Sequence, residues 1–159
     1  MLTALLAVGG WGQGSTDDGE VAPGQIEGRP AASDLSPLQA RVDQAPAGAT
    51  VVVPAGTYRG DLFLDRAITL RAQGDVTLIG SGHGSVVRVR AAGVTIEGFA
   101  IDGQRGGDLG RDSSGIHVTG ADATIRRCRI RNALFGIYLR ESSGTVVEDV
   151  EVVGIMGLA

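Results

Sequence analysis

Residues 122–132, DATIRRCRIRN, repeat a pattern that also occurs in GVTIEGFAIDG at 93–103 and in GTVVEDVEVVG at 144–154. Apolar positions coincide in the three segments at spacings of 29 and then 22 residues. The columns are Ile96, Ile125 and Val147; Phe99, Cys128 and Val150; and Ile101, Ile130 and Val152. A unit of roughly 22 residues made only of short strands and turns must stack on its neighbours to bury its apolar side. The repeat therefore predicts an all-β fold, a right-handed parallel β-helix.

Two further columns support the stacking. A strand precedes each later segment, in GSVVRV, SGIHV and FGIYL, and this places Val87, Ile116 and Ile137 in register. Gly103, Asn132 and Gly154 form the other column, and these residue types tolerate a left-handed backbone, so we expect the same turn in every coil. A β-sandwich would use antiparallel hairpins and would not explain the constant register. A leucine-rich repeat would need its helix or asparagine signature.

Composition agrees with one compact unit that is rich in turns. The chain has 159 residues and 26 glycines, but only 3 Phe, 2 Tyr and 1 Trp. A net charge of -4 does not suggest binding to nucleic acid or to an acidic membrane. The single cysteine excludes an internal disulfide framework and a zinc site of several thiolates. No apolar run reaches the roughly 18 residues of a membrane span.

The first 34 residues differ from the rest of the chain. Residues 2–8 resemble the apolar part of an export signal, although no Lys or Arg precedes them. Residues 12–34 are rich in Gly, Ser, Asp, Glu and Pro, as in linkers. We therefore divide the chain into a signal-like segment with a disordered linker, 1–34, and a β-helix domain, 35–159. An export signal and a plain disordered tail are both compatible with the first of these segments.

A short helix begins the β-helix domain. Ser36 is a suitable N-cap, with Pro37 at the first helical position and Gln39 three residues after the cap. One apolar face is formed by Leu38, Val42 and Ala45. The helix is expected to stop at Pro46, and a strand at 51–53 then ends in the turn PAG. Because the open end of a stack would otherwise invite aggregation, we expect this helix to cap the first coil.

Cys128 stands in DATIRRCRIRN between arginines, which raises the question of a reactive thiol. Its column mates are Phe99 and Val150, so its side chain is expected to point into the stack as a small hydrophobe. A thiol buried in apolar surroundings has a raised pKa and low reactivity. We therefore expect Cys128 to be a core residue and neither a ligand nor a nucleophile.

The arginines of the same segment are expected to point outward and to meet acidic neighbours. The expected neighbours are Glu97 and Glu148 for Arg126, Asp149 for Arg127, Glu151 for Arg129, and Asp102 for Arg131. Opposite charges on adjacent strands each contribute about 0.2 to 1 kcal/mol. Because the basic patch is neutralised in this way, an arginine band for nucleic acid is not predicted.

One cluster of polar residues is a candidate site for chemistry. The insertion QRGGDLGRD and its approach hold the densest polar cluster, made of Asp102, Arg105, Asp108, Arg111 and Asp112. Carboxylates and arginines beside a β-helix groove could serve a lyase, epimerase or hydrolase of polysaccharides, with Ca²⁺ bridging acid sugars. The spacing lacks the D-x-D-x-D-G order of a calcium loop, so a solvated loop is the plainer interpretation.

The two histidines are candidate metal ligands. Gly82, His83 and Gly84 resemble the GHG of polygalacturonases, but no paired aspartates precede them, so a turn histidine is the plainer interpretation. His117 is expected on the outer face of its strand, in column with Arg88 and Tyr138, where it could contact a ligand or a soft metal or simply belong to a stacked surface ladder.

The run LQARVDQAPAGATVVVPAGTYRGDLFLDRAITLRAQG at 38–74, followed by GVTIEGFAIDG, DSSGIHV and LFGIYLRESSGTVVEDVEVVG, closely resembles the NosD family, the periplasmic β-helix proteins required for maturation of nitrous oxide reductase. The resemblance covers about 38–154. It implies an exported, periplasmic location and a non-enzymatic accessory role with an ABC transporter and a copper-chaperone lipoprotein in assembling the copper centre of the reductase. The fold class was first associated with carbohydrate binding, so a polysaccharide-active protein or a carbohydrate-binding module is the alternative.

This chain differs from typical members of the NosD family in two features. Copper is the cofactor that the resemblance implies, yet the chain has only 2 His and 2 Met, and no metal-ligand motif transfers residue by residue. Family members look much longer, so we interpret the chain as a truncated N-terminal part. We expect such a piece to be marginally stable or to self-associate through its C-terminal edge.

Overall fold

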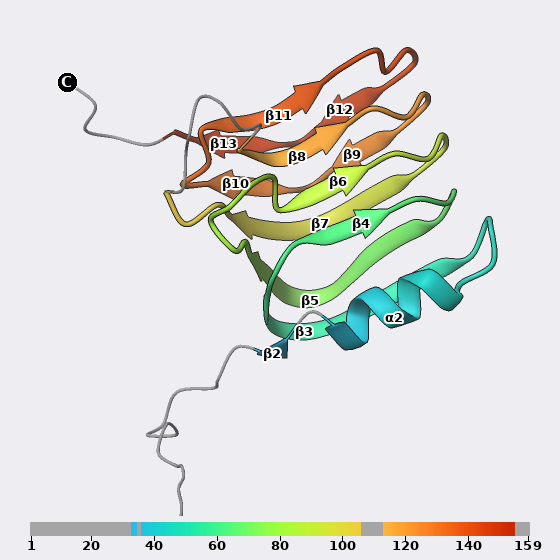
Figure 1. The fold of residues 1–159 in the computed structure, drawn as a ribbon, viewed down its shortest axis with the longest axis horizontal. Helices are drawn as coiled ribbons and strands as arrows, with labels where there is room; N and C mark the ends of the chain where they lie inside the picture. Colours follow the sequence, from blue (N-terminus) through green and yellow to red (C-terminus); the bar gives the residue numbers. More distant parts are fainter. Residues whose placement is uncertain (1–32, 35, 106–112, 155–159) are drawn as a thin grey trace, which may run out of the picture. The chain divides into compact units, whose positions relative to one another are not determined.

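The structure, a computed structural model, describes residues 33–34, 36–105 and 113–154. The described part contains one helix and a series of strands that stack in parallel coils (Figure 1). The elements are β2 (Ser33–Asp34), α2 (Ser36–Gln44), β3 (Thr50–Arg59), β4 (Leu62–Leu64), β5 (Thr69–Ile79), β6 (Val87–Val89), β7 (Thr95–Asp102), β8 (Ser114–Val118), β9 (Thr124–Arg126), β10 (Arg129–Arg131), β11 (Phe135–Leu139), β12 (Val146–Glu148) and β13 (Glu151–Val153). The signal-like segment and most of the linker, residues 1–32, lie outside the described residues.

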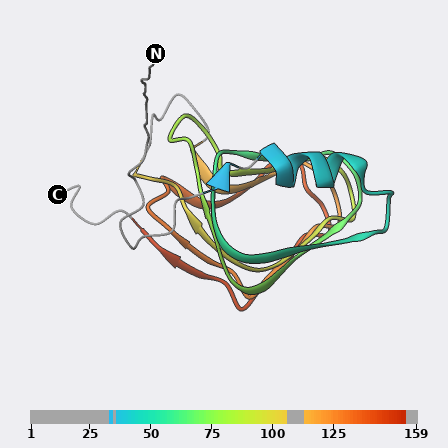
Figure 2. The ribbon, with the colours of Figure 1, turned by 90° about the horizontal axis from the view of Figure 1, so that it is seen from below.

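The strands form two sheets in which every paired neighbour is parallel. One sheet follows the order β12-β9-β7-β5-β3-β2, with β10 joined to β7 and β13, and the other follows β11-β8-β6-β4. Consecutive strands of each sheet belong to successive coils, because the chain crosses to the other sheet before it returns. Figure 2 shows the coils superimposed, with α2 in front of the first coil. The predicted parallel β-helix is confirmed.

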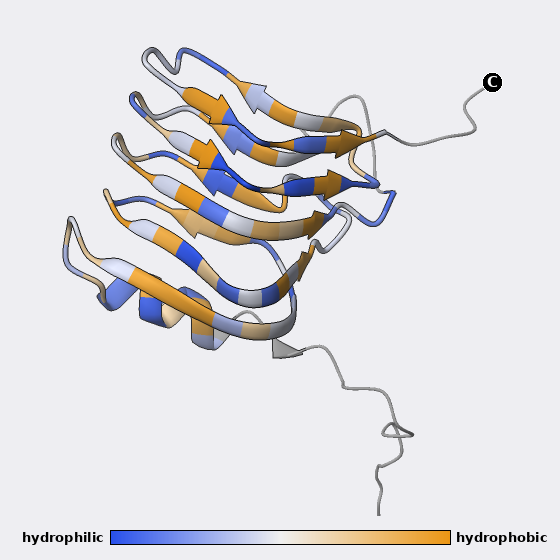
Figure 3. Ribbon diagram, turned by 180° about the vertical axis from the view of Figure 1, so that it is seen from behind, coloured by the Kyte–Doolittle hydropathy of each residue, from blue (hydrophilic) through white to orange (hydrophobic). Residues whose placement is uncertain are grey.

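The apolar columns are in the expected register. Ile96 pairs with Ile125, and Ile125 pairs with Val147. The same holds for the other two columns that the pairing defines, Ile101, Ile130 and Val152 in one and Val87, Ile116 and Ile137 in the other. Figure 3 shows apolar segments of successive strands above one another. The buried members of these columns form one continuous core between the two sheets, whereas Val147 and Val152 of the last described coil are exposed.

Two strands are longer than the sequence predicts. The expectation that the strand at 51–53 ends in the turn PAG was wrong, because β3 continues to Arg59. Its register with β5 shifts between Pro54 and Gly56, so the ladder is irregular directly after the proline, a residue that has no N–H to donate. The next coil repeats this shift, since the pairing of β5 with β7 is irregular between Arg71 and Val76.

The turn column of Gly103, Asn132 and Gly154 is only partly left-handed, so the expectation of one shared turn was wrong. Among these three residues, only Asn132 has a positive φ, 56°. Glycine is needed at position 103 for a different reason, because the backbone of the next coil lies very close to it. A Cβ atom there would lie 2.7 Å from the carbonyl oxygen of Asn132 and 2.8 Å from Cα of Ala133.

Left-handed residues do recur at two other corners of the coil, at the same spacings as the apolar columns. They are Gly93, Asp122 and Gly144 at one corner, and Gly98, Arg127 and Asp149 at the other. Glycine and aspartate adopt this conformation at low cost, whereas an arginine does so less readily. Arg127, with a φ of 53°, shows that the stacked strands on either side enforce the corner.

The predicted capping helix is confirmed. Leu38, Val42 and Ala45 are buried, and α2 packs against β3 and β4. The Gln39 side chain bonds to the edge of β4, because its Nε2 donates to the carbonyl oxygen of Phe63 at 2.9 Å and its Oε1 accepts from the Phe63 N–H at 2.8 Å. This amide therefore takes the place of a neighbouring strand. No helix in the described ranges is long and apolar enough to cross a membrane.

Candidate functional site

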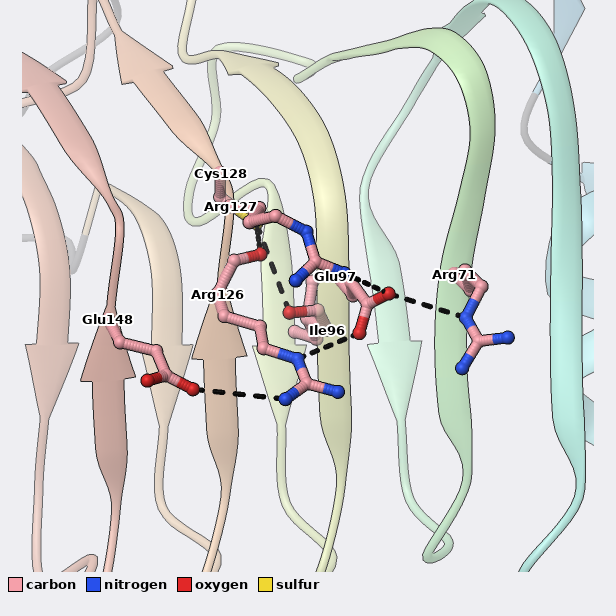
Figure 4. Close-up of polar contacts among 7 residues, drawn as sticks. All are labelled: Arg71, Ile96, Glu97, Arg126, Arg127, Cys128 and Glu148. Atoms are coloured by element: carbon pink, nitrogen blue, oxygen red, sulfur yellow. Dashed lines mark hydrogen bonds and ion pairs between the residues drawn. The ribbon is translucent and has the colours of Figure 1, made fainter.

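An ion-pair cluster lies on the outer face of the larger sheet, around Glu97 of β7. Strand pairing puts Arg71, Glu97, Arg126 and Glu148 in one row across four coils. Oε2 of Glu97 accepts a hydrogen bond from Nε of Arg126 at 2.8 Å, and its Oε1 lies 3.4 Å from Nε of Arg71. Nη2 of Arg127 reaches the same Oε1. Figure 4 shows Arg71 and Arg126 on opposite sides of the carboxylate.

The arginines hold Glu97 in its ionised form. The hydrogen bond from Arg126 lowers the pKa of Glu97 most; burial opposes it, and the charges of Arg126, Arg127 and Arg71 lower the pKa further, so the net shift is downward. The residue is only 7% exposed. A carboxylate in this state is a poor general acid at neutral pH. The cluster therefore fixes three strands in register rather than offering a proton.

The expected neighbours of the other arginines are confirmed, with one change of partner. Arg129 Nε lies 2.7 Å from Glu151 Oε1, and Arg131 Nε lies 3.0 Å from Asp102 Oδ2. Arg127 was expected beside Asp149, but its guanidinium pairs with Glu97. The left-handed backbone at Arg127 accompanies this change of partner. The predicted neutralisation of the basic segment is thus observed, mostly through register partners.

Asp102 forms a second fixed carboxylate, at the end of β7. Its Oδ1 accepts from the Gln104 N–H at 2.8 Å and from Nδ2 of Asn132 at 3.1 Å, while Oδ2 accepts from Arg131. Burial, the largest influence, raises the pKa of Asp102, but the hydrogen bonds from Gln104, Asn132 and Arg131, together with the charge of Arg131, lower it by more. The net pKa is below its ordinary value, so this aspartate is also ionised.

The structure joins only part of the polar cluster predicted around the insertion. Nε of Arg105 donates to Oδ1 of Asn132 at 3.4 Å, and Asn132 in turn donates to Asp102. These three residues and Arg59 line an open depression of about 290 Å³ on the surface. The remaining candidates, Asp108, Arg111 and Asp112, lie outside the described residues, so the catalytic reading of the cluster stays a prediction.

A shallow groove of about 450 Å³ crosses the corner where the coils bend at left-handed residues. Charged side chains that line it come from three coils, and they are Asp75, Arg127, Arg129, Asp149 and Glu151. Gly74 and Gly98 leave the backbone of two coils open to the groove. Sequence reasoning missed this groove, although the shared spacing of Gly98, Arg127 and Asp149 was available as a signal.

Cys128 lies below this groove and is buried, as predicted. Burial is the largest influence on the thiol and raises the pKa of Cys128 above its ordinary value. Its Sγ lies 3.3 Å from the carbonyl oxygen of Arg126, on the side of the sheet that faces the core. The thiol is therefore in its protonated, unreactive form and occupies the place that Phe99 and Val150 have in the neighbouring coils.

The two candidate metal ligands lie on different elements. His83 is exposed in the bend that follows β5, where its backbone N–H donates to Oγ of Ser81 at 3.2 Å. His117 of β8 pairs in register with Arg88 and with Tyr138, as predicted. Its ring lies edge-on to the Tyr138 ring, with 4.9 Å between the ring centroids. Within the described part of the chain, no three His, Cys, Asp or Glu side chains are grouped so that they could hold a metal ion.

Comparison with known proteins gives two informative relatives. A protein of Pseudomonas aeruginosa named "Probable ABC transporter binding protein NosD" is 33% identical over 102 residues, which are 63% of this chain and 24% of that protein. A protein of Stutzerimonas stutzeri with the same name is 30% identical over 104 residues, 64% of this chain and 22% of that protein. The chain is NosD-like. It spans about a quarter of the length of these curated NosD relatives.

Neither of the other two comparisons adds to this NosD likeness. No family model matches the chain, and no solved structure matches it. The likeness to NosD therefore depends on the two curated relatives, together with the parallel coils that the sequence motifs predicted.

Proposed function

We propose that this chain belongs to an ABC-transporter-associated binding protein that acts in the periplasm as a non-enzymatic accessory in assembling the copper centre of nitrous oxide reductase. The observation that carries the proposal is the similarity to two proteins named as ABC transporter binding proteins of the NosD type. Because the chain spans about a quarter of those proteins, their complete activity and partners remain part of the proposal.

The geometry of the outer surface favours binding over catalysis. The carboxylates of Glu97 and Asp102 are both ionised and both held by arginines, so neither is poised to donate a proton. Hydrogen-bonded side chains of this kind hold a surface rigid, and a rigid surface loses little conformational entropy when it binds a partner. The charged groove above Cys128 is a surface of this type, because Arg129 and Glu151 on its wall are paired at 2.7 Å.

The described residues do not fit a copper site of their own. His83 and His117 lie on different elements, and the thiol of Cys128 is buried and protonated, whereas copper prefers thiolate, thioether or imidazole ligands in one place. In this proposal copper is therefore carried by a partner lipoprotein, and the β-helix contributes a surface on which the partners meet.

Deletion of the gene for this chain tests the proposal. In a strain that makes nitrous oxide reductase, we expect loss of the gene for this chain to leave the reductase protein present but deficient in copper, with loss of nitrous oxide reduction. The measurements are the copper content and visible spectrum of the purified reductase, and the control is the strain complemented with the same gene. A reductase with full copper content in the deleted strain would contradict the proposal.

A direct assay separates this proposal from a polysaccharide-active enzyme. The purified chain is immobilised, and binding of purified subunits of the ABC transporter is followed with and without the lipoprotein. In parallel the chain is incubated with uronate polymers, where the appearance of unsaturated products absorbing in the ultraviolet would support a lyase instead. We expect transporter binding and no ultraviolet-absorbing product.

A further inference from the structure

The arginines of the two sheets differ in their partners. On the outer face of the larger sheet, Arg71, Arg126, Arg129 and Arg131 each lie 2.7–3.4 Å from a carboxylate oxygen of a neighbouring coil. Among the described arginines in the strands of that sheet, only Arg59 has no such partner. The smaller sheet shows the opposite pattern, because its described strands β4, β6, β8 and β11 contain no Asp or Glu.

Three arginines lie on the outer face of the smaller sheet. Arg88 is in β6, and Arg90 and Arg140 directly follow β6 and β11, where both are exposed. The backbone N–H groups of Arg90 and Arg140 bond to carbonyl oxygens of the coil below at 2.9 Å, so these residues continue the parallel ladder. No ion pair joins the three arginines to another residue of the described ranges.

A row of rings accompanies these arginines. Register pairs Phe63 with Arg88, Arg88 with His117, and His117 with Tyr138, so the four residues lie on successive coils. The guanidinium carbon of Arg88 lies 5.3 Å from the centroid of the Phe63 ring, as in a cation–π pair, and Phe63 is 40% exposed. Figure 1 shows the strands that carry this row stacked along one side of the β-helix. We call the surface formed by Phe63, Arg88, Arg90, His117, Tyr138 and Arg140 the basic face.

The charges of the basic face are not balanced within the described coils. Opposite charges on adjacent strands stabilise the pair, as on the larger sheet, whereas like charges close together destabilise a sheet. Between Arg90 and Arg140 lies Thr119, which is neutral, and Asp65 in the coil below Arg90 pairs with Arg66 at 3.6 Å. The basic face therefore stays positive on a chain whose net charge is -4, and an acidic partner would neutralise it.

The basic face runs along the side of the stack. Its residues belong to successive coils, so stacking of further coils lengthens this face and does not cover it. Arg88 and His117 lie in β6 and β8, and each of these strands has described strands of the same sheet on both sides. The positive charge and the rings are thus properties of inner coils.

The size and chemistry of the basic face indicate the kind of partner. Neighbouring strands lie about 4.8 Å apart and alternate residues of a strand about 6.8 Å apart, so Arg88, Arg90 and Arg140 form a patch roughly 10 Å across. Such a patch fits a few carboxylates of a polypeptide, with an apolar side chain against Phe63. A nucleic acid or an anionic membrane is a far more extended polyanion, and the net charge of -4 opposes its approach.

We propose that the basic face binds an acidic segment of a partner polypeptide. Its carboxylates pair with Arg90 and Arg140, because a guanidinium group can donate two parallel hydrogen bonds to one carboxylate. An apolar side chain of the segment packs on the exposed ring of Phe63, which also holds Arg88 in place. This inference concerns a different sheet from the charged groove, and it does not rest on the proposed role in copper-centre assembly.

Binding of an acidic peptide to the full chain tests the inference. The probe is a short peptide rich in glutamate, with leucine and serine at the other positions and a neutral fluorescent label. The matched control has glutamine in place of every glutamate. Fluorescence anisotropy gives the dissociation constants. We expect the acidic peptide to bind, the glutamine peptide not to bind over the same concentrations, and added salt to weaken the binding.

Nuclear magnetic resonance locates the bound peptide, because the sequence has only 2 tyrosines. Tyr138 belongs to the basic face, whereas Tyr58 is in β3 of the larger sheet, where its hydroxyl donates to the Pro54 carbonyl oxygen at 2.9 Å. We expect the acidic peptide to shift the ring resonances of Tyr138 and to leave those of Tyr58 unchanged.

Two double variants remove the same charge from different faces. Arg90→Gln with Arg140→Gln removes two exposed cations of the basic face that form no ion pair in the described part of the chain, so the variant should fold as the parent does. Binding of the acidic peptide should weaken by about fivefold or more. In the matched control, Arg59→Gln with Arg129→Gln on the larger sheet, binding should change by less than about twofold. Circular dichroism checks the fold of both variants.

Each outcome has a defined meaning. Weaker binding in the basic-face variant alone, together with a shift at Tyr138, supports the inference. Equal effects of the two variants, a shift at Tyr58 alone, or no binding of the acidic peptide overturns it. Tighter binding of phosphatidylglycerol vesicles or duplex DNA than of the peptide, lost in the basic-face variant, also overturns it, because the occupant would then be an extended polyanion. The reductase assay is independent of these measurements, so the inference and the proposed function can fail separately.

Discussion

Nε of Arg126 lies 2.8 Å from Oε2 of Glu97, across two coils whose residues are 29 positions apart in the sequence. The pair is possible because Arg126 and Glu97 are register partners of parallel strands. The same carboxylate also receives Arg71 and Arg127. One nearly buried glutamate therefore ties together side chains from three coils.

The first prediction concerns this glutamate. In Glu97→Gln the three arginines lose their common counter-charge, and the neutral amide can accept from fewer of them. We expect the free energy of unfolding to fall by about 1 to 3 kcal/mol, a range that allows for solvent around the partly exposed arginines. Urea unfolding followed by circular dichroism measures the change.

The matched control for this change is Glu148→Gln, in the same row of the sheet. Glu148 is exposed and lies 3.8 Å from Arg126, so its loss should change the unfolding free energy by less than about 0.5 kcal/mol. Equal effects of the two substitutions would show that burial of Glu97 has no part in stability.

The second prediction concerns acid. The pKa values of Glu97 and Asp102 are lowered from ordinary values of 4.5 and 3.8, so the unfolded chain binds protons more readily than the folded one. Their contribution to stability is complete above those ordinary values and is lost as the pH falls through the lower, folded values. We expect the urea midpoint to decline below about pH 4.5, and to decline less in the double variant Glu97→Gln and Asp102→Asn. A decline of equal size in the variant would assign acid sensitivity to other groups.

The third prediction concerns the thiol. Because Cys128 is buried and its pKa is raised, a thiol reagent should modify the folded chain far more slowly than the unfolded chain, at a rate that rises with urea. Cys128→Ser should cost about 1 to 3 kcal/mol through burial of a hydroxyl, whereas Cys128→Val, which copies the residue of the next coil, should cost less than about 1.5 kcal/mol. Rapid modification of the native chain would place the thiol at the surface.

The fourth prediction compares two glycines of one turn column. A methyl group in Gly103→Ala would meet the backbone of Asn132 and Ala133, and backbone cannot move aside as a flexible side chain can. We expect a loss of about 1 to 3 kcal/mol. In Gly154→Ala the added methyl group has no atom of the described residues within 4 Å, so the change should be neutral within about 0.5 kcal/mol. Thermal unfolding of both variants checks the comparison, and similar melting temperatures would argue against close approach at Gly103.

Most of the fold could be predicted from sequence because the repeat makes each apolar column visible several times. Ile96, Ile125 and Val147 have the same chemical character and a constant offset, and stacking is the arrangement that explains both. The outward arginines followed from the same columns, because side chains alternate between the two faces of a strand. Burial of Cys128 followed from Phe99 and Val150 in the same way.

The remaining features depend on backbone geometry that residue types do not reveal. Proline and glycine in PAG are typical of a turn, but β3 continues past them beside its parallel neighbour β5, with a shift of register between Pro54 and Gly56. The left-handed conformation of Arg127 could not be read from an arginine, which rarely adopts it. The change of partner from Asp149 to Glu97 accompanies this left-handed backbone, which recurs at Gly98 and Asp149 beside the groove.

The coils differ in length without any loss of register. Arg126 and its partner Glu97 are 29 residues apart, Arg129 and its partner Glu151 are 22 residues apart, and both pairs meet across adjacent strands. The segment between β7 and β8 has 11 residues, eight more than the 3 between β10 and β11, and the following segment is one residue shorter, so the two coils differ by seven residues while the strands keep their alignment. An engineer who wishes to graft a recognition loop or a reporter peptide can therefore lengthen the chain between β7 and β8, provided that Gly103 and the contacts of Gln104 and Arg105 are kept.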